Sequence, residues 1–479
     1  MKSILKKIRQ CGAFNKESGV PYAKAVALMS LFTFTFLGAE FLFVNMISLT
    51  VAGNQSVASQ NYALGISVIG FALYPLYCRF CKRNMQPMIS IGAAILSVVC
   101  LFVICRHSTY TLTMSMGLIL FLLLGVFGSA VFYKSLCLIE NNTYTARLVG
   151  ISYMLGVLLQ IAINNLIHKD TFEAVILSFF ILLLAALLIL TEKSSIVPAF
   201  SEDSPSEKNG KIGKYSLKII IILVAFIVLM TCIFSTLDNA VTLYHANKVA
   251  NIGQWARLLL AVSGLLAGFL FDIAGRKYMS MIMYCIMILS TTCLVVIQFA
   301  GPFTVGLIIF YLSAGFFAVF FTASFIEIAR YTRVPQLWAG IGRAVNNLVA
   351  VAITGGSLAL LDSGNNIAIT TIELLLFVLT SVAALVYTNE RNNFFEELET
   401  KKNEKLNGRE RLQKLSEQFS LTPREAEVFG LLVNTDDSLQ IIADRLYVSR
   451  RTLERYVSAL YEKTGAKSRI GLVSLYNSI

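Results

Sequence analysis

The chain has 479 residues, of which 56% are hydrophobic and only 14% are charged, and its mean hydropathy is +0.70. Water-soluble domains carry about 25% charged residues, so this composition excludes an ordinary globular protein for most of the chain. The formal net charge is +12. A basic excess of this size is typical of nucleic-acid-binding proteins and of membrane proteins, and the positions of the basic residues distinguish the two.

Long apolar segments fill most of the first 388 residues. AVILSFFILLLAALLIL (174–190) and LKIIIILVAFIVLMTCIF (217–234) are apolar on every side. Each is close to the roughly 20 residues that a helix needs to cross a bilayer. About twelve such segments are centred near residues 37, 67, 97, 123, 157, 181, 228, 262, 288, 315, 348 and 377. We therefore predict a twelve-helix transmembrane domain over residues 25–388, after a cytoplasmic segment at 1–24.

The distribution of lysine and arginine predicts the orientation of these spans. If the N-terminus is cytoplasmic, the cytoplasmic segments up to residue 340 hold about twenty Lys and Arg. The opposite loops hold four, at Arg106, Lys169, Lys248 and Arg257. Because basic residues favour the cytoplasmic side, we expect both termini to lie in the cytoplasm. This asymmetry accounts for most of the net charge, so the charge by itself is not evidence for nucleic-acid binding.

The residue types that support catalysis or metal binding are sparse. The nine cysteines lie mainly within or beside the spans, and the three histidines are scattered along the chain. No disulfide framework or metal site follows from this pattern. The sequence also lacks a Walker loop, a receiver-type domain and a nucleophile–base pair in a plausible setting. We therefore expect no enzyme activity, no cofactor and no metal.

A polar segment divides the spans into six plus six. TEKSSIVPAFSEDSPSEKNGKIGKYSLK (191–218) is charged and has two prolines, as a long cytoplasmic mid-loop would. Between spans eight and nine lies GFLFDIAGRKYM (268–279). Here Gly275 permits a tight turn, and Asp272 can pair with Arg276 or cap the next helix.

This second segment resembles the cytoplasmic signature of the major facilitator superfamily, G-x-x-x-D-x-x-G-R-[KR]. The equivalent first-half segment, YPLYCRFCKRN (74–84), keeps the basic residues but lacks the aspartate and the turn glycine. The resemblance implies that fold, with spans one, four, seven and ten around a central cavity. The decayed first copy disfavours active transport.

Ionisable and amide side chains inside the spans predict a binding pocket, because such groups are costly in lipid unless they face a cavity or a partner. Span seven places Ser235, Asp238, Thr242 and His245 on one helical face. The candidate ligand-binding residues are Glu40, Asp238, Asn239, Arg343 and Asn346. Further polar candidates are Gln160, Asn164, Glu327 and Asn347.

A structural interpretation of the same residues remains open. They could instead form hydrogen bonds between helices, with an Asp238–Arg343 ion pair holding the bundle closed. Glu327, Asp238 and His245 could also lie near the membrane interface and be solvated.

The last 91 residues differ from the rest in composition. Residues 389–420 form a charged linker, predicted to be partly helical, in which Lys405 interrupts the seven-residue spacing of Leu398, Leu412 and Phe419. Residues 421–479 predict four short helices. Thr422 and Glu425 form a capping box for the first.

The third of these helices has the pattern of a DNA-reading helix. Ser449 is a natural N-cap, and Leu453, Val457 and Leu460 point to one side. The opposite face carries Arg451, Glu454, Arg455, Ser458 and Glu462. A second helix is expected at 438–446, with Ile441, Ile442 and Leu446 inward. This is helix-turn-helix architecture, whose second helix enters the major groove.

LTPREAEV and IADRLYVSRRTLERYVSALYEKTGAKSR, within 421–479, resemble the DNA-binding domain of the LuxR/NarL family. The resemblance implies that Glu454 and Arg455 read base edges, with Ser458 one turn further on. Phosphate contacts are expected from Arg450, Arg451 and Lys463. The domain has eight basic and seven acidic residues, so we expect it to bind double-stranded DNA as a homodimer on paired half-sites.

The whole chain resembles the transporter-like LuxR regulators, an all-α architecture of a 12-span bundle followed by a small helix-turn-helix domain. The favoured hypothesis is a membrane-bound, one-component transcriptional regulator in the bacterial inner membrane, in contact with lipid. An unknown small molecule in the bundle would alter DNA binding. The alternative is a working secondary transporter with an autoregulatory or vestigial DNA-binding tail.

Overall fold

The computed structural model describes residues 16–477 except 52, 83, 107–108, 140–143, 168, 195–209, 247–255, 301–302 and 364. Within these residues the regular structure is helical and contains no strand, which confirms the predicted all-α class. The chain divides into two compact units, Met1–Arg391, here called the bundle, and Asn392–Ile479, here called the C-terminal domain.

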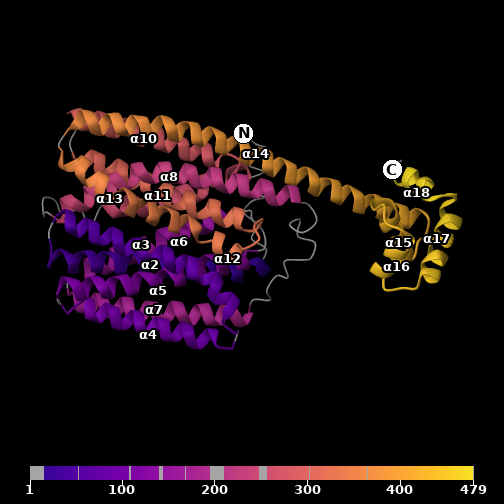
Figure 1. Cartoon of the computed structure of the whole chain (residues 1–479), viewed down its shortest axis with the longest axis horizontal. Coiled ribbons are helices and arrows are strands. Elements are labelled where there is room, and N and C mark those ends of the chain that lie inside the picture. The colour runs from indigo at the N-terminus through magenta and orange to yellow at the C-terminus, as the bar shows by residue number, and fades with distance from the viewer. Residues whose placement is uncertain are drawn as a thin grey trace. The chain divides into compact units, whose positions relative to one another are not determined.

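The helices of the bundle fall into two halves, coloured indigo to purple and magenta to orange in Figure 1. The first half consists of α2 (Lys16–Ser48), α3 (Asn54–Phe80), α4 (Gln86–Ile104), α5 (Tyr110–Leu138), α6 (Thr145–Leu166) and α7 (Asp170–Ser194). The second consists of α8 (Gly210–Ala246), α9 (Ala256–Phe271), the 3₁₀ turn η2 (Ile273–Arg276), α10 (Met279–Ala300), α11 (Phe303–Ala329), α12 (Pro335–Trp338), α13 (Ile341–Asp362) and α14 (Asn366–Gln418).

Ten helices of the described residues are long and apolar enough to cross a membrane. Two further apolar stretches, Arg257–Phe271 and Met279–Thr291, are shorter, so the predicted count of twelve spans is not confirmed. Helices also extend into segments predicted as polar connections. α2 begins at Lys16 inside the expected 1–24 segment, and α8 begins at Gly210 inside the expected mid-loop. The part of that loop at 195–209 lies outside the described residues.

The two halves meet along α6 and α9, where glycines bring the backbones into contact. A Cβ on Gly150 would lie 2.6 Å from the carbonyl oxygen of Gly264 and 2.7 Å from the Cα of Gly268. Small residues allow this close approach, which is how helices associate in lipid without a hydrophobic driving force. The seam therefore depends on the absence of side chains.

Asp272 strengthens the same seam. Its carboxylate accepts hydrogen bonds from the backbone N–H groups of Ala146 (3.2 Å) and Arg147 (2.8 Å), at the start of α6. It also pairs with Arg276 at 3.4 Å, as the sequence predicted. The helix that Asp272 caps is α6 of the first half rather than the next helix in sequence. Gly275 adopts a left-handed φ of 65°, consistent with the predicted tight turn.

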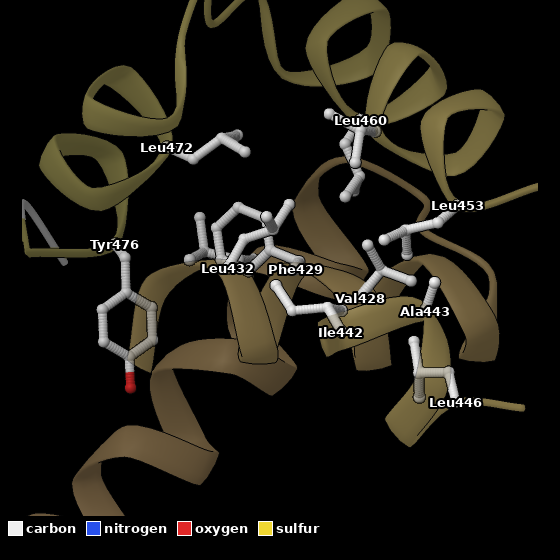
Figure 2. Packing of buried hydrophobic residues seen from close by; sticks show 12 residues of the cluster. Val428, Phe429, Leu432, Ile442, Ala443, Leu446, Leu453, Leu460, Leu472 and Tyr476 are labelled. Atoms are coloured by element: carbon white, nitrogen blue, oxygen red, sulfur yellow. The ribbon is translucent and has the colours of Figure 1, made fainter. Parts of the chain in front are cut away.

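The C-terminal domain contains the end of α14 together with α15 (Pro423–Asn434), α16 (Leu439–Arg445), α17 (Arg450–Thr464) and α18 (Arg469–Asn477). The linker predicted to be partly helical is thus helical as far as Gln418. Figure 2 shows the apolar core between these helices, including Phe429, Leu432, Leu453, Leu460 and Leu472.

Leu415 of α14 belongs to this core and is 1% exposed, and Leu412 and Phe419 pack against it. Two of the spaced residues of the linker, Leu412 and Phe419, therefore pack against the core of the domain within a single chain. Ile441, predicted to point inward, is 45% exposed, and Ala443 fills the core in its place.

Candidate ligand cavity and nucleic-acid interface

A cavity of about 240 Å³ lies inside the bundle and is lined by both halves. Its walls come from α2, α3 and α6 of the first half and from α8, α9, α11 and α13 of the second. Spans one, seven and ten line it as expected, but no lining residue comes from span four, α5. The reason is that Phe121 of α5 packs against Phe36 and Phe43, so aromatic rings of α2 lie on that side.

Four of the five candidate ligand-binding residues meet at this cavity, namely Glu40, Asp238, Arg343 and Asn346. Ser235 and Thr242 line it from the same face of α8, as their spacing predicted. Asn239 is not among the lining residues. Its amide nitrogen donates to the Ser357 hydroxyl (2.6 Å), and its amide oxygen accepts from Asn61 (2.8 Å). Asn239 therefore joins α3, α8 and α13.

The acidic and basic groups of the cavity have separate partners. Glu40 accepts a hydrogen bond of 2.8 Å from Gln60. The Arg343 guanidinium lies over the ring of Phe36, 4.9 Å from its centroid. Asp238 and Arg343, both in the described part of the chain, form no ion pair within 4.0 Å. The structural interpretation of these two residues as a closing pair is therefore not supported.

Several residues that line the cavity were not among the predicted ligand-binding residues. Arg257 counted only as a loop charge, yet it lines the cavity from the start of α9 and stacks on Phe41 at 4.8 Å. Gln60, Tyr153 and Tyr311 also line it. No spacing within one helix could identify these residues, because their position depends on which neighbours pack together. The side chain of His245 lies outside the described residues.

Glu327 belongs to a second buried cluster and is 1% exposed, so it is not a solvated surface group. Its carboxylate forms ion pairs with Arg276 (2.8 Å) and with Arg391 (2.9 Å). Arg276 in turn contacts Asp272. Because Arg391 lies on α14, this cluster ties α14 to α11, which lines the cavity, and to the seam between the halves.

The predicted nucleic-acid interface lies on α17. Leu453 and Leu460 are fully buried, whereas the face carrying Arg451, Glu454, Arg455 and Ser458 is exposed. The Ser449 side chain accepts from the N–H of Thr452 (3.2 Å), which confirms the predicted N-cap. Gly465 ends the helix with a left-handed φ of 73°.

The basic residues of this interface differ in availability. Within the described chain, no carboxylate lies within 4.0 Å of the guanidinium of Arg451 or Arg455. Arg450 pairs with Glu454 at 3.0 Å along the helix. Lys463, predicted to contact phosphate, instead pairs with Glu425 at 2.6 Å. This contact lowers the pKa of the Glu425 carboxyl and ties α17 to the start of α15.

Arg469 was not singled out in the sequence, but it organises the domain. Its guanidinium donates to the backbone carbonyls of Leu432 (2.8 Å), Asp437 (2.7 Å) and Thr435. These carbonyls lie at and beyond the end of α15, where a helix leaves acceptors without partners. Arg469 therefore positions the loop that leads from α15 into α16.

Comparisons with known proteins identify both parts. The model of bacterial regulatory proteins of the luxR family matches residues 419–476. Among curated proteins, none matches the chain at a significant level.

Solved structures of major facilitator superfamily transporters share the fold of the bundle. FucP in the outward conformation matches with a TM-score of 0.54 and 13% identity, over 78% of this chain and 99% of that one. The E. coli fucose:proton symporter FucP (N162A) matches with a TM-score of 0.53 and 13% identity, over 77% of this chain and 99% of that one. The proton:xylose symporter XylE bound to 6-bromo-6-deoxy-D-glucose matches with a TM-score of 0.53 and 13% identity, over 76% of this chain and 94% of that one.

A helix-turn-helix domain of this family implies binding to DNA, and the apolar many-helix bundle indicates a membrane protein. The chain therefore joins a bundle with the major facilitator fold to a LuxR-family helix-turn-helix domain.

Proposed function

We propose that this protein is a membrane-bound, one-component transcriptional regulator. A small molecule bound in the cavity of the bundle changes the affinity of the helix-turn-helix domain for operator DNA. The observation that best supports this is α14, one helix of 53 residues. It supplies Arg391 to the buried ion cluster of the bundle and Leu415 to the core of the C-terminal domain.

The ion cluster offers a route from ligand to output. Glu327 lies on α11, whose preceding turns contribute Phe317 and Phe321 to the cavity wall. A ligand that repacks this wall moves Glu327, the partner of Arg391, and so changes the position that α14 favours. Because the coupling is a free energy, operator DNA must change ligand affinity by the same factor as ligand changes DNA affinity.

On the DNA side, Arg455 and Arg451 are the exposed, unpaired guanidiniums of α17. Arginine can pair with guanine through two hydrogen bonds in the major groove, or with phosphate. The domain is close to neutral, so a homodimer on half-sites about 34 Å apart supplies the remaining affinity. Both termini lie in the cytoplasm of a bacterial cell, with the bundle in the inner membrane, which gives α17 access to the chromosome.

The test compares transcripts in cells that carry the wild-type chain, Arg455→Ala or Arg424→Ala. Arg424 is an exposed arginine on α15, and serves as the matched control. A regulator predicts a defined set of transcripts that changes in Arg455→Ala and not in Arg424→Ala, at equal protein levels. If no transcript changes, while a chain ending at residue 391 still takes up solute, the secondary-transporter alternative replaces this proposal.

A further inference from the structure

The cavity contains four ionisable side chains that form no ion pair with one another. They are the carboxylates of Glu40 and Asp238 and the guanidiniums of Arg257 and Arg343. All four belong to the described residues, and no two of opposite sign approach within 4.0 Å. Charges held inside a membrane domain are costly unless they meet a partner or a wet cavity. This arrangement leaves both signs available to a bound molecule.

Aromatic rings hold the two guanidiniums at different depths. Arg343 stacks on Phe36 and Arg257 stacks on Phe41, both of α2. Five residues of helix separate these rings by about 7–8 Å along the axis. A guanidinium that stacks on a ring through its face keeps its N–H edge available for a carboxylate. The cavity therefore has two separate places for an anionic group.

The carboxylates come from opposite halves of the bundle. Glu40 lies on α2 between Phe36 and Phe41 in the sequence, and one of its carboxylate oxygens accepts a hydrogen bond from Gln60. Asp238 lies on α8, on the face that also carries Ser235 and Thr242. A cation bound by both carboxylates would therefore connect the two halves of the bundle.

The rest of the wall is largely apolar and aromatic, with Phe234, Phe310, Phe317 and Phe321 among the lining residues. Its volume of about 240 Å³ lies below the 300–1,000 Å³ of pockets for drug-sized ligands. A neutral sugar would leave the four charges unpaired, and a simple anion or cation would satisfy only one sign.

We propose that the cavity binds a small zwitterion with an aromatic or aliphatic body, the chemistry of an amino acid. Its ammonium lies between Glu40 and Asp238, its carboxylate on Arg343, and its side chain against the phenylalanines. This inference rests on the proposed function, because it identifies the class of molecule that the regulator senses.

The test uses the full-length chain in lipid nanodiscs without DNA. Thermal unfolding is measured with each of the twenty protein amino acids, and then with phenylalanine, phenethylamine and 3-phenylpropionate, which share one body and differ in charge. We expect stabilisation by amino acids with aromatic or aliphatic bodies. Each singly charged analogue should bind at least about tenfold more weakly than phenylalanine. The inference is overturned if no amino acid stabilises the protein at about 10 mM, or if either analogue matches phenylalanine.

Two variants assign the charges. Asp238→Asn should weaken binding of phenylalanine and phenethylamine but leave 3-phenylpropionate unaffected. Arg343→Gln should weaken phenylalanine and 3-phenylpropionate but leave phenethylamine unaffected. Ser235→Ala, an uncharged change in the same wall, is the control. Equal losses for all three probes in both variants would contradict the assigned contacts. These binding assays contain no DNA, so they are independent of the transcript test. If no amino acid binds but the transcripts still depend on Arg455, only the ligand class is refuted. If amino acids bind but no transcript depends on Arg455, only the regulator is refuted.

Discussion

Replacing Leu415 with alanine should destabilise the C-terminal domain, although this residue lies in what the sequence marks as a linker. Leu415 is 1% exposed and packs in the core with Phe429 and Tyr476. The Tyr476 hydroxyl also donates to the carbonyl of Gly408, a second contact with α14. Removing a buried leucine side chain to alanine costs about 2–5 kcal/mol, because transfer energy is lost and a cavity remains.

That cost is large for a domain of this size, whose expected stability is about 5–10 kcal/mol. The assay is urea unfolding of the fragment 392–479, followed by circular dichroism. With a slope of about 1–2 kcal/mol per molar urea, the midpoint should fall by at least about 1 M. Lys414→Ala, an exposed neighbour on the same helix, should leave the midpoint unchanged. Equal midpoints for both variants, or a fragment 421–479 as stable as 392–479, would refute the inclusion of α14 in the domain.

Three further outcomes follow from other contacts. Because Lys463 lowers the pKa of Glu425, their contact stabilises the domain above the usual glutamate pKa of about 4.3 and is lost as pH falls through the lowered value. Urea titrations from pH 7 to pH 3 should therefore show a steeper loss in wild type than in Lys463→Gln. Gly150→Ala should reduce the thermal stability of the bundle in size-exclusion assays, whereas Gly92→Ala, with open space at its Cβ, should not. Glu327→Gln removes the buried carboxylate that Arg276 and Arg391 share, although Arg276 keeps its contact with Asp272. It should destabilise the bundle by about 3–5 kcal/mol, measured as reduced resistance to thermal unfolding in detergent.

Local features of this fold were predictable from sequence because their cause lies within a few residues. The N-cap at Ser449 and the capping box of Thr422 with Glu425 depend on side chains three positions from their partners. The burial of Leu453 and Leu460 follows from helical periodicity. The spacing on α8 likewise placed Asp238 on the cavity face.

Features that depend on contacts between distant segments were not predictable in this way. Asp272 was expected to pair with Arg276 or to cap the next helix. It does pair with Arg276, but the helix that its carboxylate caps is α6, about 125 residues earlier. Asn239 is one position from Asp238, yet the helical rotation of about 100° turns it toward Asn61 and Ser357. Lys463 has the exposed, basic character of a phosphate contact, and only the fold brings it to Glu425.

Chromatin immunoprecipitation of the full-length protein in its host tests the central claim most directly. The wild-type chain is compared with the Arg451→Ala/Arg455→Ala variant and with Arg424→Ala as the control. We predict discrete peaks that disappear in the double variant and persist in the control, since α17 presents the exposed guanidiniums of Arg451 and Arg455 to the groove. Peaks that survive loss of both arginines, or no peaks under any growth condition in which the protein is made, would contradict the assignment of α17 as the output of a membrane-bound regulator.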